Sequence, residues 1–352
     1  MAKQSFEEVL DSSDRSVAEF KHERRSFIEQ LQHILHGNIT IIPLLVLVIS
    51  FVGFGLVAGE RFYAPFNLSL IIQQVTIIGI LGIAQTLIIL TAGIDLSVAA
   101  IMVLSSVVMG NMAVSVGMPA IIAIPIGFLT GMVCGAVNGL LITRFKLPPF
   151  IATLGTWNIF FALNLWYSGS QSIRSQSIDK AAPSLKFFGE RVEIFGTQFT
   201  YGSFLMIALC VLFWYLLNRT AWGKHVYAVG DDPEAAELSG IRTSRILMSV
   251  YITAGLLCGL AAWAAIGRIG SISPQSFYEG NLEAITAVVI GGTSLFGGRG
   301  SVIGTIIGAL IVGVFRNGLA LAGVDVLWQV FAIGWLIIIA VAFDQWVRKV
   351  SA

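Results

Sequence analysis

Residues 68–116 read LSLIIQQVTIIGILGIAQTLIILTAGIDLSVAAIMVLSSVVMGNMAVSV, and this stretch decides the fold class. Two apolar runs, 68–90 and 97–116, flank a polar interruption, TAGIDLS at 91–97. Because an α-helix rises about 1.5 Å per residue, about 20 apolar residues cross a hydrocarbon core about 30 Å thick. Each run is therefore long enough to cross a bilayer as a single helix.

The rest of the chain repeats this pattern. The 352 residues are 56% hydrophobic and only 12% charged, which leaves too little polar surface to cover a water-soluble globule. We predict an all-α integral membrane protein with about ten transmembrane helices, in contact with the lipid bilayer. The net charge of +1 argues against nucleic acid as a partner. The other eight apolar runs fall at about 40–58, 120–142, 149–167, 202–217, 247–266, 282–296, 301–319 and 325–343.

Charged residues predict the orientation of these helices. Positive residues collect in the cytoplasmic connections of membrane proteins. If the N-terminus is cytoplasmic, 14 of the 21 Lys and Arg residues fall on the cytoplasmic side. We therefore expect both termini and the loop 218–246 in the cytoplasm, and the loop 168–201 outside. The predicted parts are a cytoplasmic N-terminal arm (1–36), a transmembrane domain (37–345) and a cytoplasmic tail (346–352).

Glycines at four-residue spacing predict helix-packing faces. Residues four apart lie on one face of a helix, and glycines there let a second helix approach closely. Two such runs occur, and their members are Gly131, Gly135, Gly139, Gly300, Gly304 and Gly308.

Several kinds of chemistry lack their motifs. No intramembrane group of His, Cys, Asp and Glu has metal-ligand spacing, and no GxxxxGK[ST] phosphate loop is present. We expect a chain that is not an enzyme, binds no cofactor or metal, and hydrolyses no ATP by itself.

Ionisable residues within apolar runs are functional candidates by default. Asp95 lies in the first interruption, either as an N-cap for the next helix or beside a solute path. The glycine-rich segment 291–300 interrupts two later runs and reads either as a gate or as a plain tight turn. Glu283 and Arg316 are expected at helix ends near the interface, and Arg268 in water.

The cytoplasmic loop contains a short, well-capped helix with the sequence DPEAAELSG. Asp232 suits the N-cap, Pro233 the first helical position and Gly240 the left-handed residue after the end. Such a helix serves either to meet a partner or as a connector on its own bundle.

This loop also resembles the EAA…G signature of ABC-importer permeases, carried here by Glu234, Ala235, Ala236 and Gly240. Three further segments narrow the resemblance to the ribose-type sugar permeases, over about residues 40–345. These segments are QTLIILTAGIDLSV at 85–98, PFIATLGT at 149–156 and AVVIGGTSLFGGRG at 287–300. The chain departs from many members by Ala instead of Gly at position 92 and by its long N-terminal arm, whose composition resembles the fructose-type members.

The resemblance implies a permease in the bacterial cytoplasmic (inner) membrane that imports a monosaccharide of the ribose, fructose, xylose or galactose class by alternating access, with a lean to fructose. It implies a second permease copy or close paralogue, an ABC ATPase that binds ATP-Mg and docks on the helix 232–240, and a periplasmic sugar-binding protein. Candidates for the path or gate are Gln85, Thr91, Asp95, Ser97, Asn138, Thr153, Thr293, Ser294 and Phe296.

Three alternatives stay open. An ion-coupled secondary transporter would use broken helices and a midplane charge such as Asp95. A related permease could carry branched-chain amino acids or nucleosides, and a structural or signalling membrane protein would carry nothing.

Overall fold

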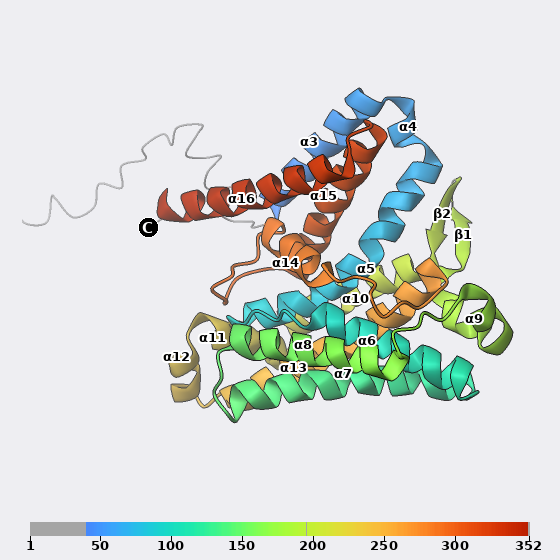
Figure 1. The fold of residues 1–352 in the computed structure, drawn as a ribbon. Helices are drawn as coiled ribbons and strands as arrows, with labels where there is room; N and C mark the ends of the chain where they lie inside the picture. The colour runs from blue at the N-terminus through green and yellow to red at the C-terminus, as the bar shows by residue number, and fades with distance from the viewer. Residues whose placement is uncertain (1–39, 195, 351–352) are drawn as a thin grey trace, which may run out of the picture. The chain divides into compact units, whose positions relative to one another are not determined.

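This computed structural model describes residues 40–194 and 196–350, so the predicted arm 1–36 lies outside the described residues. Most of the chain is helical (Figure 1). The elements are α3 (Ile41–Ala58), α4 (Glu60–Tyr63), α5 (Pro65–Leu90), α6 (Val98–Gly110), the π-helix η1 (Asn111–Ser115), α7 (Ala120–Thr143), α8 (Pro149–Ser168), α9 (Ser175–Ala181), the 3₁₀-helix η2 (Pro183–Gly189), β1 (Arg191–Ile194), β2 (Thr197–Thr200), α10 (Tyr201–Arg219), α11 (Ala221–Asp231), α12 (Pro233–Leu238), α13 (Thr243–Ile269), α14 (Gly280–Ile290), α15 (Val302–Leu321) and α16 (Val326–Val350).

Every predicted apolar run contains a helix. Within the described residues, seven helices are long and apolar enough to cross a membrane, namely α3, α5, α6 extended by η1, α7, α10, α13 and α15. The 19-residue α10 shows that the run 202–217, short in the sequence, has the length of a span. Because α8 is not among the seven and α14 has only 11 residues, the number of ten crossings stays a prediction. The cytoplasmic location of the termini stays a prediction as well.

The predicted run 282–296 is wrong in its extent, since α14 ends at Ile290. Gly292 adopts a left-handed conformation (φ 86°), and the Thr293 N–H donates to the Val288 carbonyl at 3.2 Å. This hydrogen bond closes a helix end of the Schellman type. Residues 291–301 therefore form a loop between α14 and α15, although their composition is partly apolar.

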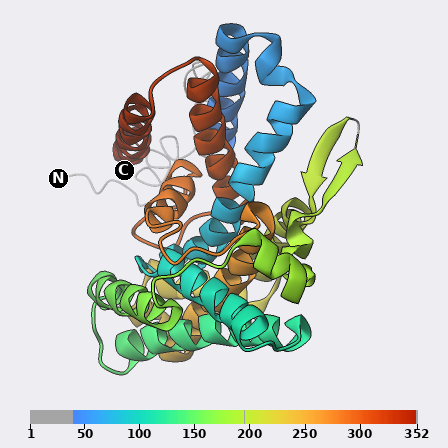
Figure 2. The ribbon, with the colours of Figure 1, turned by 45° about the vertical axis from the view of Figure 1, so that its right-hand side comes forward.

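One segment departs from the all-helical expectation. The strands β1 and β2 pair antiparallel, with Arg191 opposite Thr200 and Ile194 opposite Thr197 (Figure 2). They belong to the long polar connection predicted at 168–201, which also holds α9 and η2. The chain is therefore mostly helical and carries one small hairpin among the described residues.

The connections between helices gather in two sets. The first is named here the 220–242 end, because it contains the loop with α11 and α12; there the Gly298 N–H donates to the Leu90 carbonyl at 3.1 Å, and a Cβ atom at Gly230 would lie 1.7 Å from that carbonyl oxygen. In the second, the 169–200 end, Ile173 and Ile272 form a β-bridge and the Gln198 N–H donates to Ser69 Oγ at 2.8 Å. Successive long helices run alternately between these two ends, which places the two long loops at opposite ends of the bundle.

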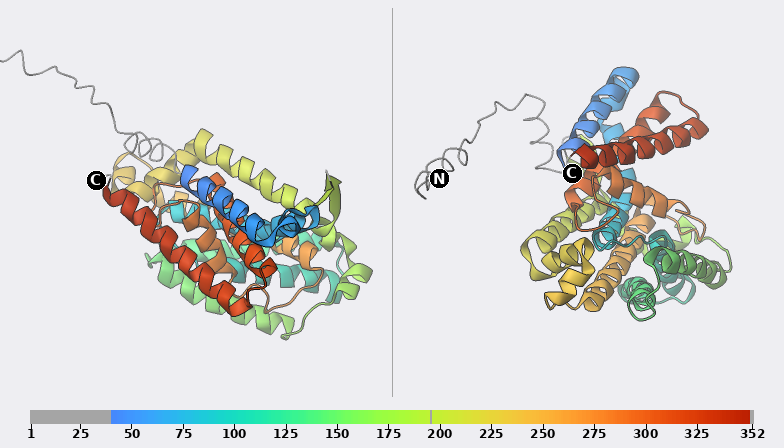
Figure 3. Two further views of the ribbon diagram at one scale, coloured as in Figure 1. Left: turned by 90° about the horizontal axis from the view of Figure 1, so that it is seen from above. Right: turned by 90° about the vertical axis from the view of Figure 1, so that its left-hand side faces the viewer.

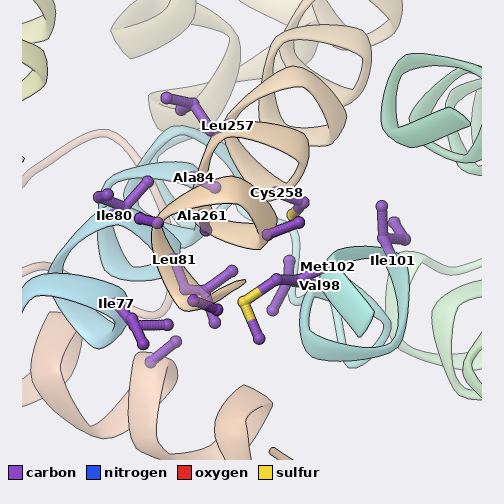
Figure 4. Packing of buried hydrophobic residues seen from close by; sticks show 14 of the residues in the cluster. Ile77, Ile80, Leu81, Ala84, Val98, Ile101, Met102, Leu257, Cys258 and Ala261 are labelled. Atoms are coloured by element: carbon purple, nitrogen blue, oxygen red, sulfur yellow. The ribbon is translucent and has the colours of Figure 1, made fainter. Parts of the chain in front are cut away.

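Buried apolar side chains of α5, α6 and α13 form the centre of the core (Figure 4). The second half of α5 is buried almost without interruption up to Leu90. Helix α15 in turn packs against α3, α5 and α14 and also contacts α16 (Figure 3). Labelled members of the central cluster are Ile77, Ile80, Leu81, Ala84, Val98, Ile101, Met102, Leu257, Cys258 and Ala261.

Glycines set the closest helix approaches. A Cβ atom at Gly131 would lie 2.2 Å from the Gly255 carbonyl oxygen, and one at Gly135 would lie 2.2 Å from the Tyr251 carbonyl oxygen. These contacts hold α7 against α13, and Gly139 continues the same face toward the side chain of Met248.

The second glycine run differs from its prediction. A Cβ atom at Gly304 would lie 2.3 Å from the Gly291 carbonyl oxygen, and one at Gly308 would lie 2.0 Å from that of Ala287, so both glycines seat α15 on α14. Gly300, however, precedes α15 and lies against the Thr293 side chain. The packing face on α15 therefore has two of the three expected glycines, because the helix starts only at Val302.

Candidate transport sites

Asp95 lies at the centre of a buried polar cluster between α5 and α6. Its side chain is 2% exposed, and its Oδ1 accepts hydrogen bonds from the Ser97 N–H and the Ser97 hydroxyl, both at 2.6 Å. Asn138 Nδ2 on α7 donates to Asp95 Oδ2 at 3.2 Å and to Ser97 Oγ at 2.8 Å. The residue that directly precedes α6 is Ser97, so Asp95 is not the N-cap that one interpretation expected. Its carboxylate instead fixes the turn and ties it to α7.

Two further predicted path residues hold the same turn. Gln85, with its amide oriented to suit both partners, donates to the Asp95 carbonyl at 3.1 Å and accepts from the Asp95 N–H at 3.2 Å. Thr153 Oγ1 at the start of α8 donates to the Ile94 carbonyl and accepts from the Leu96 N–H, each at 3.1 Å. The structure thus brings together five of the nine path candidates as one cluster, which we call the polar junction: Gln85, Asp95, Ser97, Asn138 and Thr153.

The remaining path candidates lie beside this junction or in the loop 291–301. Thr91 ends α5, and its hydroxyl donates to the Ile88 carbonyl at 2.8 Å. Thr293 and Ser294 are buried, whereas the Phe296 side chain is 73% exposed. The loop 291–301 therefore exposes the side chains of Phe296 and Arg299 and buries those of Thr293 and Ser294.

The loop 291–301 is in contact with the long connection that carries α11 and α12. The Tyr227 hydroxyl on α11 donates to the Gly300 carbonyl at 2.9 Å, and burial raises the pKa of that hydroxyl, so it is a protonated donor at neutral pH. A Cβ atom at Gly230 would lie 1.7 Å from the Leu90 carbonyl oxygen and 2.8 Å from the Gly298 nitrogen. Helix α11 thus contacts both the end of α5 and the loop 291–301.

Helix α12 has the two ends that its residues predict. Asp232 Oδ1 accepts from the Glu234 N–H at 2.9 Å and from the Ala235 N–H at 3.0 Å, and Gly240 adopts φ 85°. Ala236 is buried, whereas Leu238 is 91% exposed. Helix α12 is therefore a capped, largely exposed helix, and its role as a docking element stays a prediction.

An open cavity of about 680 Å³ lies at the surface of the bundle, where half of its ten lining residues are exposed, and it has the size typical of ligand pockets, about 300–1,000 Å³. Arg316 donates to Glu283 across it as an ion pair between α15 and α14. None of the nine path candidates lines this cavity. Its lining residues are Gln74, Ile78, Arg268, Ile269, Phe277, Tyr278, Glu279, Gly280, Glu283 and Arg316.

The sequence predicted Glu283 and Arg316 at helix ends and Arg268 in water, and the exposed Arg268 side chain and the first-turn position of Glu283 confirm two of these expectations. Arg316 lies five residues before the end of α15, and Glu283 lies in the first turn of α14. Arg268, in the last turn of α13, interacts electrostatically with both. The available signal was that ionisable groups in apolar helices mark substrate pathways. The sequence did not show that these three side chains, from three different helices, lie around one cavity.

These features define a class of protein, a multi-pass membrane protein of the transporter type. The model of one protein family, described as the permease component of branched-chain amino acid transport systems, matches residues 67–341. The chain belongs to this family and, within it, to the ribose-type monosaccharide permeases of ABC importers. No solved structure shows a significant match.

The curated relatives agree on the kind of solute. The chain is 54% identical to the fructose import permease protein of Rhizobium meliloti, over 99% of this chain and 97% of the relative. It is 39% identical to the ribose import permease protein of Bacillus subtilis, over 84% and 89% of the two chains. It is 35% identical to the D-allose transport system permease protein of Escherichia coli, over 84% and 88%. Membership in this family decides against an ion-coupled secondary transporter and against a protein without transport.

Proposed function

We propose that this chain is the membrane-spanning subunit of an ATP-driven importer of fructose. The observation that carries the choice of sugar is the identity of 54% with a fructose import permease, against 39% with a ribose import permease. The first comparison covers 99% of this chain and the second 84%. Ribose, allose and galactose are the competing sugars, since relatives with those names also match.

The proposed complex has three kinds of component. Two permease chains, either identical or paralogous, form the path across a bacterial inner membrane. An ABC ATPase binds ATP-Mg and docks on α12, and a periplasmic binding protein delivers the sugar at the 169–200 end. The permease chain itself holds no cofactor. The EAA…G pattern on a capped helix whose residues are mostly exposed supports the ATPase contact.

In the proposed orientation, the 220–242 end faces the cytoplasm and the chain crosses the membrane ten times. The alternation of long helices between two ends and the Lys and Arg distribution both support it. In a background without native cysteines, Lys180→Cys should react with an impermeant maleimide from the periplasm, and Glu234→Cys should react from the cytoplasm. Both side chains are exposed. Reversed accessibility would refute the orientation.

The proposed mechanism begins with the displacement of α12 when the ATPase dimer closes. The linkage from α11 to Gly300 and to Leu90 passes this displacement to the loop 291–301 and to the end of α5. The polar junction connects the end of α5 with α6, α7 and α8, so these helices move together. Such a rigid-body shift would open one end of the path as the other closes.

Uptake by the reconstituted complex tests the proposed function. The permease is combined in proteoliposomes with the ATPase and the binding protein of the same source, with labelled fructose, ribose or leucine outside. Fructose should accumulate only with ATP inside, and an imposed proton or sodium gradient should not replace ATP. Faster ribose uptake would refute the sugar assignment, and ATP-driven leucine uptake without sugar uptake would refute the monosaccharide class.

A further inference from the structure

The cavity between α5, α13, α14 and α15 has a lining that combines charge with an aromatic wall. It contains two arginines, Arg268 and Arg316, and two glutamates, Glu279 and Glu283, so the formal charges of its lining cancel. Gln74 on α5 adds an amide whose Oε1 atom is buried behind the lining and has no hydrogen-bond partner within the described residues. The lining thus offers both donors and acceptors without an excess of either charge.

Three of these ionisable groups project from otherwise apolar helices. Such groups are costly in a membrane protein and are retained where they face a water-filled path or pair with each other. Arg316 and Glu283 pair with each other, whereas Arg268 forms no ion pair and no hydrogen bond within the part of the chain that the structure describes. An arginine that is left with free donors at the edge of a cavity has hydrogen bonds to offer to a solute.

The aromatic wall comes from the connection between α13 and α14. Tyr278 is 56% exposed, and its ring packs against Trp157 at 5.4 Å and Phe161 at 5.7 Å, both from α8. The neighbouring Phe277 adopts φ 54°, a conformation that is unusual for a bulky residue. The Tyr278 ring is thus held by two aromatic rings of α8 while its side chain contributes to the cavity lining.

We propose that this cavity binds the monosaccharide during its passage, with Arg268 and the Glu283–Arg316 pair hydrogen-bonding to its hydroxyls and Tyr278 contacting its apolar face. A sugar hydroxyl both donates and accepts, so it matches a lining of guanidinium donors and carboxylate acceptors. The solute is uncharged, and so is the lining as a whole. This inference rests on the proposed function, because it assumes that the solute is a sugar.

Variants of the full complex test this role. Arg268→Gln and the double variant Glu283→Gln/Arg316→Gln remove the charges and keep the approximate shapes. We expect each to lower sugar uptake about ten-fold or more at saturating binding protein, because a hydrogen bond to a charged group is lost. ATP hydrolysis stimulated by the loaded binding protein should stay near the wild-type rate. The readout is therefore the number of sugars carried per ATP, which a purely structural defect would leave unchanged.

Arg61→Gln is the matched control, since Arg61 is an exposed arginine on α4 that does not line the cavity. A second measurement covers variants that fail to assemble. In a background without native cysteines, a bulky maleimide on Tyr278→Cys should block uptake and leave ATP hydrolysis intact, whereas the same reagent on Arg61→Cys should do neither.

The outcomes separate this inference from the proposed function. If the wild-type complex carries fructose and the cavity variants carry it as fast as Arg61→Gln does, the cavity assignment is overturned. Normal uptake after Tyr278→Cys modification would overturn it as well. If the wild-type complex carries ribose instead, the fructose assignment fails and the same variants are compared with ribose. If it carries leucine and no sugar, both proposals fail.

Discussion

The close packing of α7 against α13 depends on glycine, and Gly131→Ala measures how much stability the protein loses when this packing is disturbed. The added Cβ atom would meet three backbone atoms: the Gly255 carbonyl oxygen at 2.2 Å, the Gly255 carbonyl carbon at 3.1 Å and the Gly259 nitrogen at 3.3 Å. An ordinary contact is at least 3.4 Å, so the helices must separate by about 1 Å at this point. No side-chain rotation can relieve a contact with backbone.

The expected cost follows from this geometry. Overpacking of a close interface costs about 1–3 kcal/mol, while exchanging glycine for alanine in a helix gains at most about 1 kcal/mol in propensity. Gly155→Ala on α8 is the control variant, because it gains the same helix propensity and its Cβ atom would meet nothing within 4 Å. The difference between the two variants therefore isolates the steric cost. Gly139→Ala should fall between them, because its nearest contact is the flexible Met248 side chain at 2.8 Å.

Thermal unfolding in detergent, followed with a thiol-reactive fluorescent dye, measures this difference. Cys134 and Cys258 are buried on α7 and α13, so the dye reports opening of the interface itself. Cys210 is half-buried and is replaced by serine in all variants. Gly131→Ala should unfold several degrees below Gly155→Ala. Equal unfolding temperatures would refute the conclusion that backbone contact through glycine holds these helices together.

Three further predictions concern other local contacts. Asp232→Ala removes the two cap hydrogen bonds of α12, which contribute about 0.5–2 kcal/mol to its stability. This variant should therefore show lower ATP hydrolysis in the presence of the binding protein, whereas Asp232→Asn, which can still cap the helix, should keep the wild-type rate. Equal rates for the two variants would contradict the role of the cap. The buried side chains of Asn67 and Asn317 donate a hydrogen bond to each other, at 2.9 and 2.8 Å. Asn67→Ala should lower the free energy of unfolding by about 1–3 kcal/mol, because it leaves Asn317 unpaired, and the double alanine variant should lose little more. If the losses of the two single variants add up in the double variant, the two residues are not a coupled pair. Ala92 adopts φ 58°, so Ala92→Gly should stabilise the protein by about 1 kcal/mol, and an unchanged unfolding temperature would show that the turn carries no strain.

Local features were accessible from the sequence because their causes are local. Asp232, Pro233 and Gly240 predict both ends of α12, since a cap, a first-turn proline and a left-handed glycine act within one or two turns. The positions of the apolar helices follow in the same way from composition. The end of α14 was misplaced because residues after Ile290 remain partly apolar, and the left-handed Gly292 stops the helix regardless of hydropathy.

The charged cavity could not be predicted from composition because its parts are distant along the chain. Glu283 and Arg316 are separated by 33 residues and meet only when α14 packs on α15. Each residue taken alone fits an interfacial position, where a long side chain reaches water. Which ionisable residue faces a neighbour, lipid or a cavity depends on the rotation of each helix, and this rotation is set by tertiary contacts such as the seat of Gly304 and Gly308 on α14.

The polar junction and the charged cavity therefore have different expected roles, the first in structure and the second in binding the solute. In the polar junction, the Asp95 carboxylate is 2% exposed and both its oxygens already accept hydrogen bonds from Ser97 and Asn138. A solute would have to displace these partners at a cost of about 1–3 kcal/mol for each buried group left unpaired. In the cavity, the Arg268 side chain is exposed and has no protein hydrogen-bond partner among the described residues, so a solute there has to displace only water. Polar residues that are satisfied among themselves are best placed to hold helices together as a rigid body, and those that retain free donors beside open volume are best placed to meet the sugar.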